Sequence, residues 1–172
     1  MKNLSVMLVS PNSENTEKYE EDKYNERSFS TLTRVLSLAQ GYFSFVLISC
    51  NSLTLRQQIV DRLQANSAIK PRQLLLPKSA TTLYATIITE LDGEQPPALM
   101  IMGIESVVAI DRLLVSTNLL CSEFSKKLSF PLIFWVTDEI LRKMIRIAPD
   151  LHNRMPTAIR FISNSPENHK NY

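Results

Sequence analysis

The sequence predicts an α/β fold, a three-layer sandwich in which a five-stranded, mainly parallel sheet lies between helices. Five short apolar runs alternate with segments whose apolar residues recur at helical spacing. The runs at 43–48 and 131–136 are almost continuously apolar, which is typical of strands covered on both faces. The intervening segments are long enough to be crossovers, which join parallel strands. With 172 residues, of which 44% are hydrophobic, the chain can bury one core.

The first expected elements are an arm and a helix. Residues 1–27 are predicted to form a flexible polar arm, because the stretch from Pro11 to Arg27 is rich in charge and has little to bury. A helix is expected from Ser28, where apolar residues begin to recur at near-helical spacing, and Gly41 would end it. The main domain is therefore predicted to span 28–162, with a polar tail at 163–172.

Strand and helix signals alternate through the rest of this domain. Strands are expected at 43–48, 72–76, 98–102, 131–136 and 157–162, and helices at 53–65, 81–91, 111–128 and 138–148. Ser52 would cap the helix after the first strand, and Thr137 or Asp138 the helix after the fourth. Pro149 would end that last helix.

Composition narrows the function classes. The net charge is +2 and the charges are scattered, so nucleic-acid binding is not expected. Cys50 and Cys121 have no metal-ligand spacing, and His152 and His169 have no partner at a metal or triad spacing, so no metal or other cofactor is expected. Unbridged thiols suit a reducing compartment, which predicts the cytoplasm. No apolar run approaches the ~18 residues of a membrane span.

The turn after the first strand lacks the residues of a phosphate-binding loop. Such a loop needs glycines, whose amides wrap the phosphates, and a lysine, but neither residue type occurs between Cys50 and Arg56. ATP hydrolysis is therefore not expected. A residual nucleotide switch stays open as an alternative, since Ser52 at a helix start could attract an anion and Glu105 follows the third strand at the same sheet edge.

Cys50 and Arg56 also have the C-x5-R spacing of cysteine-dependent phosphatases at a strand-to-helix turn. A helix start lowers a thiol pKa, and an arginine grips phosphate oxygens. Against this hypothesis, Leu53 and Leu55 stand where amides should face an anion. The other interpretation is a buried, inert Cys50.

A modest basic patch is a candidate interaction surface, formed by Arg142, Lys143, Arg146 and Arg154. Arg142 and Arg146 are four positions apart, so they share one side of a helix and could face an acidic partner. A solvated helix face is the alternative. Asp138 and Glu139 are expected in a first helical turn, where acids favour the dipole, and Trp135 is expected in the core.

Four sets of strings point to a known family: Cys50-Asn51 with Leu55-Arg56, Met102 to Glu105, Asn118-Leu119, and Pro131 to Trp135 with Leu141 and Ala148 to Asp150. Together they resemble an N-terminal domain of bacterial, especially cyanobacterial, multidomain signalling proteins with NTPase-like and repeat modules. The resemblance covers roughly 28–162. It implies a P-loop NTPase-like sheet of the signal-transducing ATPase type, with a degenerate phosphate site and a regulatory or scaffolding role.

The leading hypothesis is therefore a non-catalytic interaction, adaptor or regulatory domain. Because the sequence ends at residue 172 with no repeat array, such a role is expected to act through another protein chain, alone or in a larger complex. A cysteine phosphatase using Cys50 and Arg56, or a residual nucleotide switch using Ser52 and Glu105, is the alternative.

Overall fold

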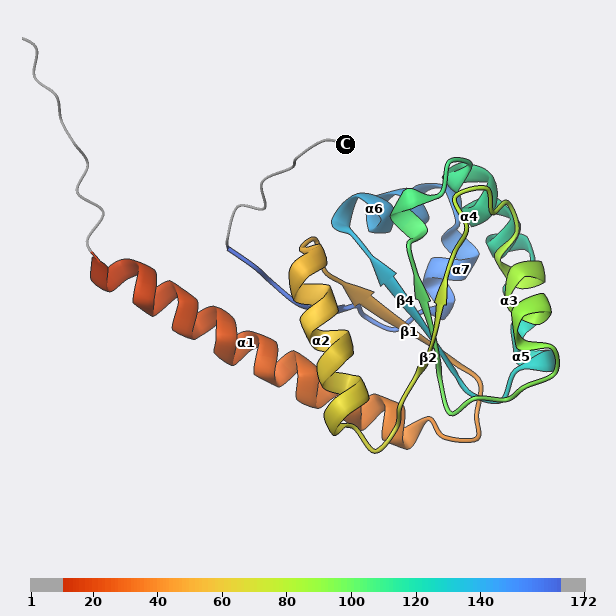
Figure 1. Cartoon of the computed structure of the whole chain (residues 1–172). Coiled ribbons are helices and arrows are strands. Elements are labelled where there is room, and N and C mark those ends of the chain that lie inside the picture. Colours follow the sequence, from red (N-terminus) through yellow and green to blue (C-terminus); the bar gives the residue numbers. More distant parts are fainter. Residues whose placement is uncertain (1–10, 165–172) are drawn as a thin grey trace, which may run out of the picture.

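Five parallel strands form one sheet in the computed structural model, which describes residues 11–164 (Figure 1). The strands are β1 (Ser44–Ser49), β2 (Arg72–Leu75), β3 (Leu99–Met102), β4 (Pro131–Val136) and β5 (Ile159–Arg160). Their order across the sheet is β2-β3-β4-β1-β5, and all pairs are parallel. Helices lie on both faces, so the predicted α/β three-layer sandwich is confirmed.

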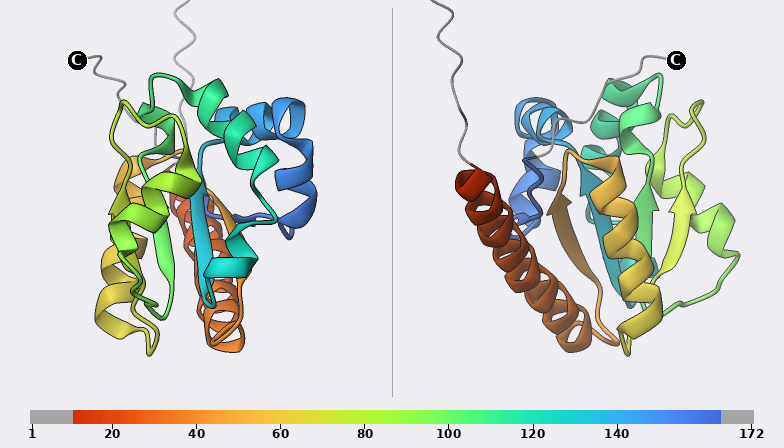
Figure 2. Two further views of the ribbon diagram at one scale, coloured as in Figure 1. Left: turned by 90° about the vertical axis from the view of Figure 1, so that its right-hand side faces the viewer. Right: turned by 60° about the vertical axis from the view of Figure 1, so that its left-hand side comes forward.

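The two faces are covered by different helices (Figure 2). One face packs against α1 (Pro11–Leu38) and α2 (Leu53–Asn66). The other packs against α3 (Leu83–Leu91), α4 (Ile110–Leu119), α5 (Phe124–Lys127), α6 (Asp138–Ile147) and α7 (Pro149–Arg154). A 3-10 turn, η1 (Ile104–Ser106), follows β3. Because successive side chains of a strand point to opposite faces, Phe45 and Leu47 of β1 join one core and Val46 and Ile48 the other.

This topology creates a crevice at the carboxyl end of the sheet. β1 and β4 are neighbours, with Ser49 opposite Val136. The chain leaves β1 toward α2 on one face and leaves β4 toward α6 on the other. Open α/β sheets bind ligands at such a switch point, outside the carboxyl ends of the strands. The turns after β1 and β4 are therefore the first place to look for a site.

The structure corrects the start of the first helix. Residues 11–27, predicted as part of a flexible arm, form the first part of α1, whose beginning extends past the sheet in Figure 1. A row of polar side chains on this helix, formed by Glu21, Asn25 and Ser28, explains why the segment is ordered instead of flexible. Ser28 donates to the Arg160 carbonyl (2.6 Å), and Asn25 both donates to the Ile162 carbonyl (2.8 Å) and accepts from the Ile162 amide (2.9 Å).

The Glu21 carboxylate continues the row by accepting from the amide of Asn164 at 2.8 Å. These bonds give partners to backbone amides and carbonyls on the outer side of the chain at 160–164, which an edge strand otherwise leaves without hydrogen bonds. Sequence composition did not show this, because the partners lie at the far end of the chain. The rest of the predicted arm (1–10) and of the predicted tail (165–172, with His169) lies outside the described residues.

Three further boundaries differ from the prediction. The helix expected at 111–128 is two helices, α4 and α5, separated by a turn. β5 is limited to Ile159–Arg160. Pro149 follows the end of α6 as expected but also begins α7, because proline suits the first position of a helix. His152 lies in α7. Trp135 is fully buried, as predicted. Within 11–164, no helix has the length and apolarity that a bilayer crossing requires.

Candidate functional site

The turn after β1 is built as a capped helix start. The Ser52 hydroxyl accepts a hydrogen bond from the Leu55 amide at 3.1 Å, and the Ser52 carbonyl accepts from the Arg56 amide at 3.0 Å. Ser52 is therefore the N-cap that the sequence predicts. Without a glycine, this turn makes an ordinary cap and not the wide amide-lined loop that surrounds a phosphate in P-loop proteins.

Asp138, at the start of α6, lies at the centre of a network that crosses the crevice. Its carboxylate accepts from the Ser49 hydroxyl (2.8 Å) and from the side-chain amide of Asn51 (3.0 Å), and the Asn51 oxygen accepts from the Asp138 backbone amide (2.8 Å). Arg160 of β5 adds an ion pair at 3.0 Å. One carboxylate thus ties the ends of β1, β4 and β5 together.

These bonds hold the pKa of Asp138 below its ordinary value. The hydrogen bond from Asn51 is the largest cause, the hydrogen bond from Ser49 follows, and Arg160 contributes less. Each favours the ionised carboxylate, because each gives the charged oxygens a donor or a positive neighbour. The sequence placed Asp138 in a first helical turn, which is correct. It did not show that this carboxylate joins three strands.

A second link joins the turns after β1 and β3. The Arg56 guanidinium, only 3% exposed, contacts Glu105 with 2.6 Å between Nη1 and Oε1, and Nη2 donates to the Cys50 carbonyl at 3.1 Å. The guanidinium carbon lies 5.7 Å from the centre of the Trp135 ring. In the described part of the chain, Arg56 Nε, Glu105 Oε2 and Trp135 Nε1 are buried without a hydrogen-bond partner. Arg56 and Glu105 are therefore joined by a single hydrogen-bonded contact and not by a bidentate one.

The structure brings Cys50 and Arg56 together, but through the backbone of Cys50. The Cys50 thiol is 1% exposed and donates to the Ser52 carbonyl at 3.3 Å. Reactive cysteines are partly exposed to solvent, whereas Cys50 is buried. The guanidinium that would grip phosphate is engaged by Glu105.

A groove beside the start of α2 has a volume of about 350 Å³ and is lined by residues of α1 and α2. Ser52 and Thr54 line one side, and the carboxylates Glu21 and Asp22 of α1 line the other, with Lys18 adding one cation. The negative charges of these two carboxylates would repel a phosphate group at the start of α2. This surface was hidden from sequence reasoning, which expected no fixed structure for the first part of α1.

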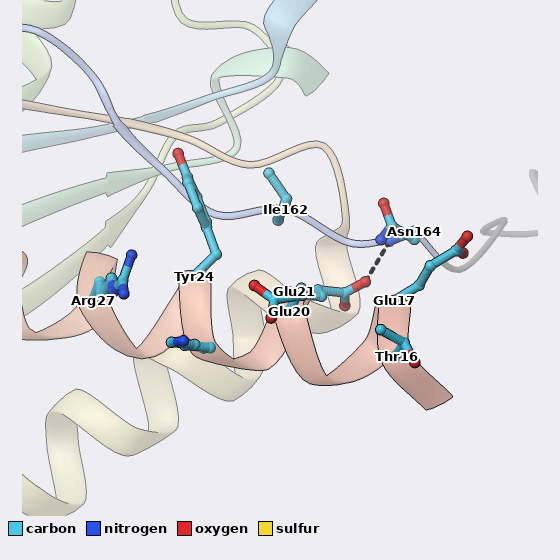
Figure 3. Close-up of a pocket in the computed structure, with 9 residues that line it drawn as sticks. Thr16, Glu17, Glu20, Glu21, Tyr24, Arg27, Ile162 and Asn164 are labelled. Carbon is cyan, nitrogen blue, oxygen red and sulfur yellow. Dashed lines mark hydrogen bonds between the residues drawn. The ribbon is translucent and has the colours of Figure 1, made fainter. Parts of the chain in front are cut away.

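A second groove, of about 390 Å³, runs between α1 and the chain at 162–164 (Figure 3). Tyr24 and Ile162 flank it, 40% and 37% exposed, and the bond between Glu21 and Asn164 is drawn as a dashed line in Figure 3. Charged side chains of α1, among them Glu17 and Glu20, form its rim. It has the composition of a small contact surface, with apolar side chains inside a polar border.

The basic patch is only partly assembled. Arg142 and Arg146 are exposed on α6, and no ion pair forms with either of them within 11–164. Lys143 is instead paired with Asp111 of α4 at 2.5 Å. Arg154, at the end of α7, lines a cavity beside the start of β1, at the opposite end of the sheet from the start of α6.

Of the predicted site residues, Cys50, Ser52, Arg56 and Glu105 meet at one end of the sheet. Sequence reasoning missed Ser49, Asn51 and Arg160 in the same place. Asn51 could have been found, since a polar side chain directly after a buried strand reaches the neighbouring strand end. In the described part of the chain, no group of three or more His, Cys, Asp or Glu residues could hold a metal ion.

Comparison with protein-family models and with curated proteins found no match to this chain. The resemblance to degenerate P-loop domains therefore stays a prediction from the residues that carry it.

Proposed function

We propose that this protein is a non-catalytic interaction module, an adaptor or regulatory domain on a degenerate P-loop NTPase-like scaffold, which acts by binding another protein in the cytoplasm. The observation that carries the proposal is the network at the switch-point crevice. Asn51, Ser49 and Arg160 all direct their polar groups to Asp138. The groups that would grip a ligand in an active α/β enzyme here bind one another.

Electrostatics support the same conclusion. A bound phosphate would meet Asp138 in the crevice and Glu21 and Asp22 beside the start of α2. Arg56, the nearest buried cation of this turn, is held by Glu105. A nucleotide would have to break these contacts and bring its own charge next to carboxylates, which opposes binding.

A contact surface is available on the first helix. The groove between Tyr24 and Ile162 is apolar inside and charged at its rim. It is formed by two segments that are fixed to each other by Asn25 and Glu21, so a partner meets a preorganised surface. Arg142 and Arg146 form a separate, smaller basic surface on α6.

The proposal is tested by partner capture that depends on one side chain. Chemical crosslinking in host cells, followed by affinity purification and mass spectrometry, should recover a protein with the wild-type chain. Tyr24→Glu should abolish that recovery, because it puts a charge between the apolar residues of the groove. Tyr42→Glu is the matched control, since Tyr42 is 73% exposed and does not line the groove.

If Tyr24→Glu and Tyr42→Glu recover the partner equally, the groove between α1 and residues 162–164 (the α1 groove) is not the contact surface. The basic surface of α6 then stays as the candidate, and the double variant Arg142→Glu with Arg146→Glu tests it. Recovery of no protein by any variant would contradict the proposal itself.

Binding of nucleotide is tested in parallel. A rise of several degrees in Tm with about 5 mM Mg-ATP, Mg-GTP or phosphate would favour the nucleotide switch or the phosphatase, because a ligand of the native state raises its stability by mass action.

A further inference from the structure

A cavity of about 580 Å³ lies at the amino end of the sheet, opposite the crevice. The start of β1 and the residue before it form one wall, with Phe43, Ser44 and Phe45. The end of α7 and the residues that follow it form another, with Arg154, Met155 and Pro156. This volume falls in the range of small-molecule sites, which are mostly apolar with a few placed polar groups.

The apolar part of the cavity is aromatic and held in place. Phe43 and Phe45 meet edge to face, with ring centroids 4.9 Å apart and an angle of 79°. Phe43 also stacks on Phe124 at 6.3 Å, and Phe45 contacts Phe134 at 5.8 Å. Because the rings behind Phe43 and Phe45 are fully buried, this wall is rigid, and it favours a further aromatic ring as occupant.

The polar part of the cavity contains a cation, Arg154. The Arg154 side chain is exposed, and no ion pair forms with it within the described residues. The Ser44 hydroxyl oxygen makes no hydrogen bond in that same part of the chain, but it is buried and belongs to the other face of β1. Arg154 is therefore the group of this cavity that pairs with an acidic ligand.

We propose that this cavity binds a small aryl carboxylate. The aromatic ring of the ligand lies against Phe43, Phe45 and Met155, where it adds to the existing ring contacts. Its carboxylate pairs with the Arg154 guanidinium, whose planar fork matches two carboxylate oxygens. The Ser44 hydroxyl takes no part, because Ser44 alternates with Phe43 and Phe45 along β1 and its side chain points to the opposite face of the sheet. Binding is non-covalent, and the site is separate from the surfaces proposed for a protein partner.

The probe is phenylacetate, with phenylacetamide as its neutral counterpart of nearly the same shape. We expect saturable binding of phenylacetate in titrations of the purified full chain followed by ¹H–¹⁵N NMR. The shifted amides should gather at 43–45 and 154–155. Phenylacetamide should bind at least about tenfold more weakly, because it lacks the charge that pairs with arginine.

One variant and two controls assign the polar contact. Arg154→Gln should weaken phenylacetate binding about tenfold, whereas Arg112→Gln, at an exposed arginine of α4 outside the cavity, should leave it unchanged. Ser44→Ala should also leave phenylacetate binding unchanged, because the Ser44 side chain lies on the other face of β1. Circular dichroism verifies that each variant is folded.

The proposal fails if phenylacetate does not saturate the protein by about 50 mM, a concentration far above the dissociation constant of a useful site. It also fails if Arg154→Gln binds as tightly as wild type, or if the amide shifts gather at the α1 groove. Because the measurement uses the chain alone, a negative result leaves the proposed protein partner untouched.

Discussion

Two serines at the two ends of strand β1 have opposite surroundings. Ser49, at the carboxyl end, is 3% exposed and donates to Asp138 at 2.8 Å. Ser44, at the amino end, has a buried hydroxyl with no hydrogen-bond partner in the described part of the chain. The same residue type therefore belongs to a network at one end of the strand and lines an open cavity at the other.

The difference teaches where this sheet can still accept a ligand. The carboxyl end is the usual ligand site of open α/β sheets, and here its side chains bridge four of the five strand ends through Asp138 and through the pair of Arg56 with Glu105. The amino end has space, an aromatic wall and an arginine without an acidic partner among residues 11–164. Four predictions break or sharpen this contrast.

The largest effect is expected from Glu105→Ala at the carboxyl end. The substitution leaves the buried Arg56 cation without its carboxylate, which should lower the free energy of unfolding by about 3 kcal/mol. Urea denaturation measures the loss. Replacing both residues, with Arg56→Met and Glu105→Leu, should cost clearly less, since no buried charge is left alone. A single variant as stable as wild type would show that this end of the sheet is not held by the pair.

The two glycines that flank β3 give the next comparison. Gly93, before the strand, and Gly103, after it, have φ of 86° and 78°, so an alanine at either site should cost about 1 kcal/mol in backbone strain. Only at Gly103 would the added Cβ meet another atom, Leu75 Cδ1, at 2.8 Å. Thermal unfolding should therefore show a greater loss of stability for Gly103→Ala than for Gly93→Ala. Because Leu75 is exposed and can move, the two losses should differ by less than about 1 kcal/mol.

The serines themselves provide a matched pair. Ser49→Ala removes a donor from Asp138 and should lower the free energy of unfolding by about 1 kcal/mol. Ser44→Ala should leave it unchanged or raise it slightly, since the Ser44 hydroxyl makes no hydrogen bond with any residue of 11–164. Urea denaturation of both variants at neutral pH makes the comparison. Equal losses would show that the two ends of β1 do not differ as described.

The smallest effect is a pH dependence that arises from Asp138. Because its pKa in the folded protein is lowered, its contribution to stability is fully present above the unfolded pKa of about 3.9 and is lost as the pH falls through the lower, folded value. Asn51→Ala removes the main cause of the lowering. Between about pH 4 and pH 2, the stability of this variant should fall less steeply than that of wild type. Denaturation curves at several pH values test this, with Asn153→Ala on α7 as control.

The sequence was sufficient for the elements whose signals are local. The apolar runs predicted the central strands β1 and β4, and Ser52 and Thr137 predicted the helix starts that they cap. It was also sufficient to place Arg56 and Glu105 at the same end of the sheet. Local signals could not predict contacts between distant segments.

The first part of α1 is the clearest example of this limit. Its composition is that of a solvated arm, and its order depends on Asn25 reaching Ile162, at a separation of 137 positions. Arg160 likewise reaches Asp138 only because β5 lies beside β1. The resemblance to degenerate P-loop domains concerns the same turn after β1, but it could not indicate that Asn51 and Asp138 would bind each other across the crevice.

The polar row of α1 also has a consequence for how the chain matures. During synthesis, Glu21, Asn25 and Ser28 leave the ribosome well before the backbone that they cover at 160–164. Until then, nothing in that row can protect the border of the growing sheet. A nascent chain halted before residue 160 would therefore keep β1 uncovered along one side, open to pairing with another unfinished copy.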